Sequence, residues 1–161
     1  ALSTQISGFR QTETGYTGGA VANPSYGQVL SGKTGHAEAV QIEYDPEVIS
    51  YDEIMELYFT AHDPTQLNRD GPAVGTHYRS AIFVDSSEQE ASARRAIKRA
   101  RRQWSRPITT AIEPLGPWYR AEECHQKYFF SPASWDDPYC TVTIHPRLHR
   151  FRELHADRLK D

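Results

Sequence analysis

The sequence predicts an α+β fold arranged as a two-layer plait with a mixed sheet and long functional loops. Segments with strand and helix patterns alternate from about residue 36 to residue 115, in the order strand, helix, strand, helix, strand. The G-x-G-x-x-G turn that opens a doubly wound nucleotide-binding sheet does not occur. A length of 161 residues suits one compact domain, which we assign to 1–161.

The first half of the chain predicts two strands and one helix. Polar alternation predicts a strand at 9–17. The segment 15–35 is rich in glycine and contains an Asn-Pro turn, so we expect a long functional loop without regular structure. Alternation at the period of two resumes in a strand at 36–44. A helix at 51–62 is predicted by apolar residues at helical spacing behind a capping box that starts at Ser50.

The second half predicts two more strands and three more helices. The strands are expected at 78–84 and 109–115, and the helices at 86–104, 121–130 and 146–160. Ser87 and Glu90 fit a cap for the first of these helices. In the last one, helical spacing places Leu148, Phe151 and Leu154 on the face toward the core.

Composition restricts the class of protein. A formal net charge of −3 argues against a general nucleic-acid binder, although 94–102 is strongly basic. We interpret that run as a solvated helix face, and the alternative is a patch for phosphate or a partner. Two cysteines, Cys124 and Cys140, are too few for a disulfide scaffold and suit a reducing compartment such as the cytoplasm. No run is long enough to span a bilayer, so we expect a soluble protein without a membrane partner. We also expect a monomer.

The strand at 36–44 contains the most informative residue. Val40, Ile42 and Tyr44 share one face, and the same alternation places His36 and Glu38 on that face, pointing inward. A carboxyl group that enters an apolar layer loses hydration, so we expect its pKa to rise toward neutrality. A protonated carboxyl can donate a hydrogen bond or a proton. The alternative is that Glu38 lies at a wet strand edge, paired with a lysine such as Lys33.

Two loops rich in Tyr, His and Gly, 15–38 and 63–80, each lead into a predicted strand. We expect them to meet at one end of the sheet, where Tyr26, Glu38 and Tyr78 would surround an aromatic pocket. Two phenols and one carboxyl suit a small polar oxygen on an otherwise apolar ligand, because buried hydroxyl groups without a partner are costly. The alternative for each tyrosine is core packing with its hydroxyl group in water.

Other candidate chemistry is weaker. The chain has seven histidines, but His145 and His149 have neither an H-E-x-x-H motif nor a cysteine pair beside them, so we expect no metal site. Cys124 and His125 are neighbours on a predicted helix, and adjacent helical residues point about 100° apart. We therefore do not expect a Cys–His nucleophile, and we interpret Cys124 as an ordinary helix residue.

Seven segments stand in the order, and close to the spacing, of one known family: Gly15–Gly19, Asn23–Tyr26, Ser31–Glu38, Tyr44–Pro46, His62–Gln66, Gly75–Ile82 and Ala121–Tyr128. On these motifs the chain resembles peptide methionine sulfoxide reductase A over almost its whole length. The resemblance implies a ferredoxin-like plait and reduction of the S epimer of methionine sulfoxide, free or in proteins. It further implies thioredoxin or another thiol as the reductant, with no metal or other cofactor.

The resemblance also assigns roles to residues. In the family, a cysteine thiolate attacks the sulfoxide sulfur, a glutamate matching Glu38 protonates or hydrogen-bonds the oxygen, and tyrosines matching Tyr26 and Tyr78 hold it. The implied substrate-binding residues are Gly35, His36 and His77. Methionine leaves, a sulfenic acid remains, and a resolving cysteine with thioredoxin restores the thiol. Cys140, after Tyr139, matches the place where many members keep that resolving cysteine.

The chain departs from the family pattern in two ways. The family's nucleophile lies in a Gly-Cys-Phe-Trp-Gly segment on its first strand, which by its spacing falls just upstream of Ala1. An acidic residue usual two places before Gly75 is Ala73 here. Two hypotheses follow: an active reductase whose nucleophile lies upstream, or a diverged member that binds oxidised methionine without reducing it. A third hypothesis makes Cys124, which stands where an aspartate or tyrosine is commoner, or Cys140 a relocated nucleophile.

Overall fold

The computed structural model describes residues 2–160 and confirms a mixed α+β fold. The strands are β1 (Phe9–Thr17), β2 (Ala37–Tyr44), β3 (Arg69–Asp70), β4 (Ala73–Val74), β5 (Ala81–Val84), β6 (Ala111–Pro114) and β7 (Tyr119–Arg120). The α-helices are α1 (Tyr26–Leu30), α2 (Tyr51–Ala61), α3 (Ser87–Ala100) and α4 (His145–Leu154). Short 3₁₀ and π turns connect them, and no helix among the described residues is long and apolar enough to cross a membrane.

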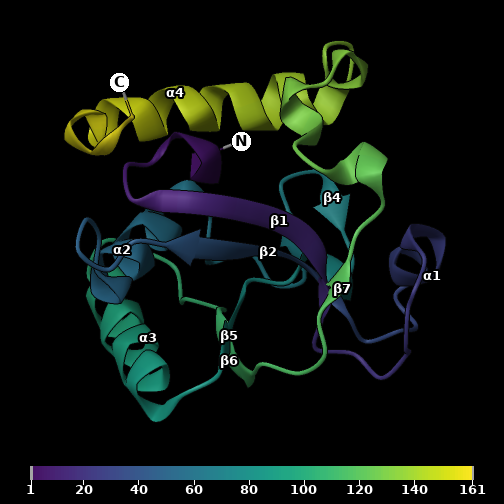
Figure 1. The fold of residues 1–161 in the computed structure, drawn as a ribbon, viewed down its shortest axis with the longest axis horizontal. Coiled ribbons are helices and arrows are strands. Elements are labelled where there is room, and N and C mark those ends of the chain that lie inside the picture. Colours follow the sequence, from purple (N-terminus) through teal and green to yellow (C-terminus); the bar gives the residue numbers. More distant parts are fainter. Residues whose placement is uncertain (1, 161) are drawn as a thin grey trace.

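The central sheet is antiparallel and has the order β2-β1-β7. In the middle strand, Tyr16 lies opposite Glu38 of β2 and opposite Tyr119 of β7. Figure 1 shows β1 and β2 crossing the middle of the molecule, with α4 on one side of them and α3 on the other. The sheet therefore places Tyr16 of the middle strand between Glu38 on one edge strand and Tyr119 on the other.

Two smaller sheets complete the fold. β3 and β4 form an antiparallel hairpin, in which Asp70 pairs with Ala73. β5 and β6 are parallel, and α3 lies between them in the chain. The turn Thr76–Tyr78 connects the hairpin to β5 and contacts β2. This contact places the end of the second predicted loop beside the strand that carries Glu38.

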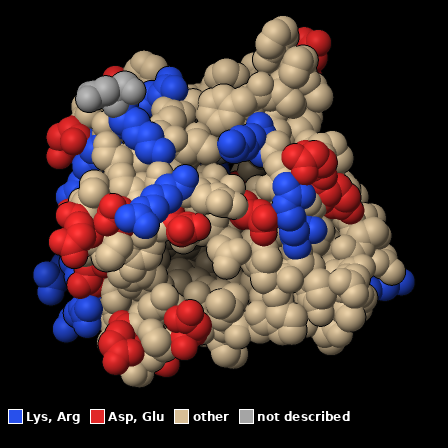
Figure 2. Space-filling view, viewed as in Figure 1, with Lys and Arg blue, Asp and Glu red and all other residues tan. Residues whose placement is uncertain are grey.

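The main core lies where α2 and α3 pack against the sheets. Ile54, Leu57 and Phe59 of α2 are buried there, together with small residues of α3 such as Ala93 and Ala96. Small side chains on α3 allow the two helices to approach closely. On the face that Figure 2 shows, acidic and basic side chains are interspersed rather than gathered into a field of one sign.

The predicted capping box at the start of α2 is confirmed. The Ser50 side chain accepts from the Glu53 N–H, and the Glu53 carboxylate accepts from the Ser50 N–H at 2.8 Å. The cap predicted for α3 was wrong by one residue, because Ser86 rather than Ser87 accepts from the Gln89 N–H. Along α3, basic side chains are exposed and several pair with acids, as Arg95 does with Asp52 of α2 at 3.1 Å. This arrangement is that of a solvated helix face.

In two segments the predicted secondary structure differs from the secondary structure observed. The loop expected at 15–35 contains α1, because Ser25 and Gln28 form a capping box. The helix expected at 121–130 is not formed. The Ala121 N–H donates to the Thr14 carbonyl of β1, and Lys127 has a left-handed φ of 51°, so short 3₁₀ turns replace a helix.

Two predicted core residues were also wrong. Val40 is 51% exposed because β2 is an edge strand whose face is covered only in part, although Ile42 and Tyr44 do pack against the core. In α4, Leu148 and Phe151 are buried as expected. Leu154 is 53% exposed because it is the last residue of that helix.

Candidate active site

The structure brings together the three residues predicted to form the pocket. Tyr26 is the first residue of α1, Glu38 lies on β2, and Tyr78 is the last residue of the turn Thr76–Tyr78. The hydroxyl groups of Tyr26 and Tyr78 hydrogen-bond to each other. The charge of Glu38 acts on both phenols. The prediction that loops 15–38 and 63–80 meet is thereby confirmed.

Glu38 has the environment expected of an inward-facing carboxyl group. Its Oε1 atom is buried and has no hydrogen-bond partner among the described residues. Burial raises the pKa of Glu38 from its ordinary value of 4.5 to about 7, which confirms the predicted shift toward neutrality. In the described part of the chain it forms no ion pair with Lys33, the alternative considered above. A carboxyl group with this pKa is partly protonated at neutral pH and can donate a proton.

The two phenols remain protonated donors at physiological pH. Burial, followed by the charge of Glu38, raises the pKa of Tyr78 to about 12. The same two causes, in the same order, raise the pKa of Tyr26. The arrangement therefore offers up to three O–H groups from three different elements. Such a group of donors suits an oxygen that carries partial negative charge.

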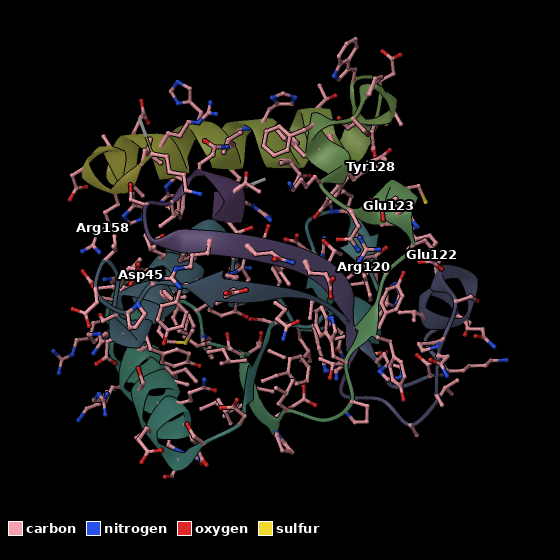
Figure 3. The ribbon with its side chains drawn as sticks, in the orientation of Figure 1. Asp45, Arg120, Glu122, Glu123, Tyr128 and Arg158 are labelled. Carbon is pink, nitrogen blue, oxygen red and sulfur yellow. The ribbon has the colours of Figure 1, made fainter. Side chains whose placement is uncertain are left out.

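Glu122 was missed by the sequence reasoning, and it attaches α1 to the sheet. One of its carboxylate oxygens accepts from the Tyr16 hydroxyl and the other from the Tyr26 N–H, both at 2.7 Å. Although burial acts to raise it, these donors lower the pKa of Glu122. The ring of Tyr26 also lies against that of His125, with 4.4 Å between centroids. Figure 3 shows Glu122 between β7 and α1, at the end of the molecule that also holds Tyr128.

His36 is enclosed within the glycine-rich loop. Its Nδ1 accepts from the Gly19 N–H at 3.0 Å, and its Nε2 lies 2.7 Å from the Val21 carbonyl, which assigns the proton to Nε2. Gly35 has a φ of 76°, which favours glycine. A side chain on Gly19 would lie 2.4 Å from the backbone of His36. Gly35 and His36 thus shape the loop that leads into Glu38.

His77 is buried directly beside the phenol of Tyr78. The ring centroids of the two residues are 4.0 Å apart, and neither ring nitrogen of His77 has a hydrogen-bond partner among the described residues. Burial lowers the pKa of His77, so the ring is neutral at physiological pH. Gly75 has a φ of 151°, and a Cβ there would lie 2.4 Å from the imidazole. The turn around Gly75 therefore determines where His77 and Tyr78 lie.

The two cysteines have different environments, and both are free thiols. Cys124 is exposed on the 3₁₀ turn Glu123–His125. Cys140 is 3% exposed and begins the π turn Cys140–Ile144. Burial and then the charge of Asp137 raise the pKa of Cys140, so its thiol is protonated at neutral pH. The charges of both Cys140 and Tyr26 act on Tyr128, so Cys140 lies at the same end of the molecule as the pocket.

The surface has one hollow near the candidate site and another away from it. One, of about 350 Å³, lies between the residues before α1 and the segment around β7, and Glu122 forms part of its wall. The other, of about 430 Å³, lies at the N-terminal ends of α2 and α3, away from Glu38. The first adjoins the Tyr26 side of the candidate site. The described residues contain no group of three or more His, Cys, Asp and Glu side chains placed to hold a metal ion.

Comparisons with known proteins agree on one family. The family model described as "Peptide methionine sulfoxide reductase" matches residues 1–159. A protein of Haloquadratum walsbyi named peptide methionine sulfoxide reductase MsrA is 45% identical over 159 residues, which cover 99% of this chain and 90% of that protein. Reduced Mxr1 from Saccharomyces cerevisiae superposes with a TM-score of 0.72 at 34% identity, covering 80% of this chain and 72% of Mxr1. Mxr1 in complex with Trx2 matches with a TM-score of 0.51 at 26% identity, covering 76% and 67%.

Proposed function

Because this chain belongs to the peptide methionine sulfoxide reductase family, whose members reduce methionine sulfoxide with a thiol reductant, we propose that Tyr26, Glu38 and Tyr78 form the oxygen-binding side of its active site. The observation that carries this proposal is the Glu38 carboxyl group. Its pKa of about 7 and its unpartnered Oε1 leave a proton donor free to engage a ligand. Relatives named as reductases give no support to the alternative of a module that only binds oxidised methionine.

The chemistry assigned to the trio follows from the polarity of the sulfoxide. Its oxygen carries partial negative charge, so the hydroxyl groups of Tyr26 and Tyr78 donate hydrogen bonds to it. Glu38 gives its proton to that oxygen as a thiolate attacks the sulfur. The attack joins the cysteine sulfur to the methionine sulfur. The hydroxyl group is then transferred from the methionine sulfur to the cysteine sulfur, and the bond between the two sulfurs breaks with its electron pair on methionine, so that methionine leaves and a sulfenic acid remains. We propose the S epimer as the substrate, free or in proteins.

Gly35, His36 and His77 act on this pocket in different ways. Both nitrogens of His36 are engaged by the backbone, so Gly35 and His36 hold the loop that precedes Glu38 rather than contact the ligand. His77, whose ring nitrogens have no partner among the described residues, lies against Tyr78 and fixes the direction of that phenol. The three are therefore proposed as substrate-site residues that mainly position the donors.

The sulfur chemistry needs an attacking thiolate and a resolving thiol. Cys140 is poorly suited to attack from its present place, because burial holds its thiol protonated. We assign it the resolving role, in which its sulfur displaces water from the sulfenic acid and forms a disulfide. Thioredoxin then reduces that disulfide, as the complex of the yeast relative with Trx2 suggests. The attacking thiolate is not assigned to Cys124, which lies exposed on its turn.

Three finer points belong to the same proposal. We propose a two-layer, ferredoxin-like plait for the single domain assigned to 1–161, in which β5, α3 and β6 form one β-α-β unit. Two free thiols support a reducing, cytoplasmic environment. Surface charges of mixed sign, without a large field of one sign on the face shown, support methionine sulfoxide in proteins rather than nucleic acid as the ligand (Figure 2). We propose that the protein acts as a monomer.

The test is calorimetric titration of the purified protein with a peptide that contains one (S)-methionine sulfoxide. We expect saturable binding that Glu38→Leu weakens by about tenfold, since it removes one neutral donor to a buried acceptor, which contributes about 1.4 kcal/mol. Glu43→Leu, an exposed change on the same strand, is the matched control and leaves binding intact. The same samples with dithiothreitol are assayed for methionine. Equal affinity of Glu38→Leu and the unmodified protein would contradict the assignment.

A further inference from the structure

A half-buried carboxylate outside the trio connects the β3–β4 hairpin to the C-terminal segment. The Asp70 carboxylate accepts from the Tyr139 hydroxyl at 2.5 Å and from both terminal nitrogens of Arg147, at 2.6 and 3.0 Å. We call Asp70, Tyr139 and Arg147 the Asp70 clamp. Although burial by itself raises it, the donors lower the pKa of Asp70, so the carboxylate is charged at neutral pH. This is a bidentate Arg–carboxylate pair with a third donor, a geometry that adds specificity as well as energy.

The clamp lies where the sequence departs from its family. Asp70 is the direct cross-strand partner of Ala73, the position where an acidic residue was expected. Directly opposed residues of an antiparallel pair project to the same side of the hairpin. A carboxylate is thus supplied to this side from β3 instead of β4.

Both ends of the segment that carries Cys140 are held by the clamp. Tyr139 directly precedes Cys140, and Arg147 is the third residue of α4, which follows the π turn Cys140–Ile144. Gly71, next to Asp70, faces Thr143 of that turn, since a Cβ there would lie at an ordinary contact distance of 3.4 Å from its side chain. The hairpin therefore holds the cysteine turn at its start and its end and lies beside its middle.

The clamp also reaches the pocket. Burial first, then the Asp70 carboxylate and, further away, the charge of Glu38 all raise the pKa of Tyr139. Tyr139 is thus electrostatically coupled both to the Asp70 pair and to the Glu38 carboxyl group. Tyr139 thus connects the hairpin to the cysteine turn, and its phenol lies within reach of the charge of Glu38.

We propose that Asp70 is a positioning residue, and that the clamp keeps the Cys140 thiol buried and releases it when the clamp opens. The proposal rests on the resolving role given to Cys140 above. Asp70 acts on no reacting atom itself. Its effect is to set the fraction of time during which the thiol can leave its buried place and meet another sulfur.

The test measures how fast Cys140 reacts with a disulfide reagent, 5,5′-dithiobis(2-nitrobenzoate), in the 161-residue chain with Cys124→Ser, in which Cys140 is the remaining thiol. We expect Asp70→Asn to speed the reaction on the order of 10- to 100-fold, because a lost charged hydrogen-bond pair shifts a local opening equilibrium by that factor. Tyr139→Phe, which keeps the ring and removes only the donor, should give a smaller increase in the same direction. Arg147→Lys should fall between the unmodified clamp and Arg147→Met.

The matched control is Asp45→Asn, which breaks an Asp–Arg pair of similar length, 2.7 Å from Arg10. Figure 3 shows Asp45 at the opposite end of the molecule from Glu122. This change should leave the Cys140 rate unchanged. Each rate is measured again in urea below the unfolding transition, because exposure through local opening is nearly independent of urea and exposure through global unfolding is not.

The proposal is overturned if Cys140 reacts at the same rate in Asp70→Asn and Tyr139→Phe as in the chain that carries only Cys124→Ser. It is also overturned if the increase in rate grows with urea concentration in the way that global unfolding does. If Asp70→Asn does not fold, the rates measured for Tyr139→Phe, Arg147→Lys and Arg147→Met test the proposal by the same criterion. The assay contains no sulfoxide, so its result is independent of whether Glu38 binds that group. Failure of the clamp and failure of the proposed function are therefore distinguishable.

Discussion

The raised pKa of Glu38 predicts that its removal stabilises the protein at high pH. The native state holds the Glu38 proton up to a pH of about 7, whereas the unfolded chain releases it near 4.5. Between these values the native state binds more protons than the unfolded state, so the free energy of unfolding falls as pH rises through this window. Above pH 7 both states are ionised at Glu38, and the whole penalty for a buried charge is present.

The size of the effect follows from the shift. A difference of this size between the native and unfolded pKa values corresponds to about 3 kcal/mol lost at high pH. Glu38→Gln keeps the shape of the side chain and removes the ionisation. Relative to the unmodified protein, the variant should therefore gain about 2 to 3 kcal/mol in free energy of unfolding between pH 5 and pH 8.5. Any pH-independent offset from the amide group cancels in this difference.

The assay is urea denaturation followed by tryptophan fluorescence, for both proteins at pH 5 and at pH 8.5, with the slope in urea checked for two-state behaviour. Glu43→Gln on the same strand is the control. Its free energy of unfolding should differ from that of the unmodified protein by the same small amount at pH 5 and at pH 8.5. If Glu38→Gln and the unmodified protein keep a constant difference across this range, the carboxyl group is not desolvated in the native state. The proton-donor role argued for Glu38 would then lose its basis.

Three further predictions concern the pocket. Affinity for a methionine sulfoxide peptide should fall as pH rises through about 7, because only the protonated Glu38 donates to the ligand, and titration calorimetry at several pH values would show this. Tyr26→Phe and Tyr78→Phe should each weaken the same binding by about fivefold to tenfold, one hydrogen bond each, and unchanged affinity in both would exclude the phenols as donors. Gly75→Ala should lower the free energy of unfolding by about 2 kcal/mol or more, since its φ of 151° and its Cβ both conflict with the local structure, whereas Gly27→Ala, with nothing within 4 Å, should not.

Glu38 shows why part of the site was predictable. Alternation at the period of two fixes which residues of a strand share a face, and this is a local property that needs no knowledge of the partners. The inward direction of Glu38 and the rise in its pKa followed from that pattern. The meeting of Tyr26 with Tyr78 followed from two loops that both lead into strands of one small domain. Val40 on the same face is exposed, because coverage of an edge strand depends on distant elements.

The segment 121–130 shows where local pattern fails. Its composition suits a helix, but the Gln126 side chain donates to the Thr14 carbonyl and accepts from the Thr14 N–H, at 2.8 and 2.9 Å, across 112 positions. Those contacts with β1 outweigh helix propensity, which is a weak preference. α1, by contrast, had a local signal in the Ser25 and Gln28 pair, which was missed because the surrounding glycines suggested a loop.

The contacts of Glu122 and of the Asp70 clamp have no local signal in the sequence and could not be predicted from it. Each joins side chains separated by dozens of positions, and no periodicity in the sequence connects them. Only the folded arrangement of β1, the β3–β4 hairpin and the C-terminal segment makes them neighbours. Charged residues in such segments are ordinarily exposed, so composition alone favours a solvated role for them.

The most direct test of the central claim is a carbon-13 NMR titration of the Glu38 carboxyl group, with and without a saturating peptide that contains (S)-methionine sulfoxide. Our account predicts a pKa of about 7 in the free protein and a higher pKa in the complex, because a ligand that binds the protonated form raises the proton affinity. An ordinary pKa near 4.5 that the peptide leaves unchanged would contradict the assignment of Glu38 as the proton donor to the sulfoxide oxygen.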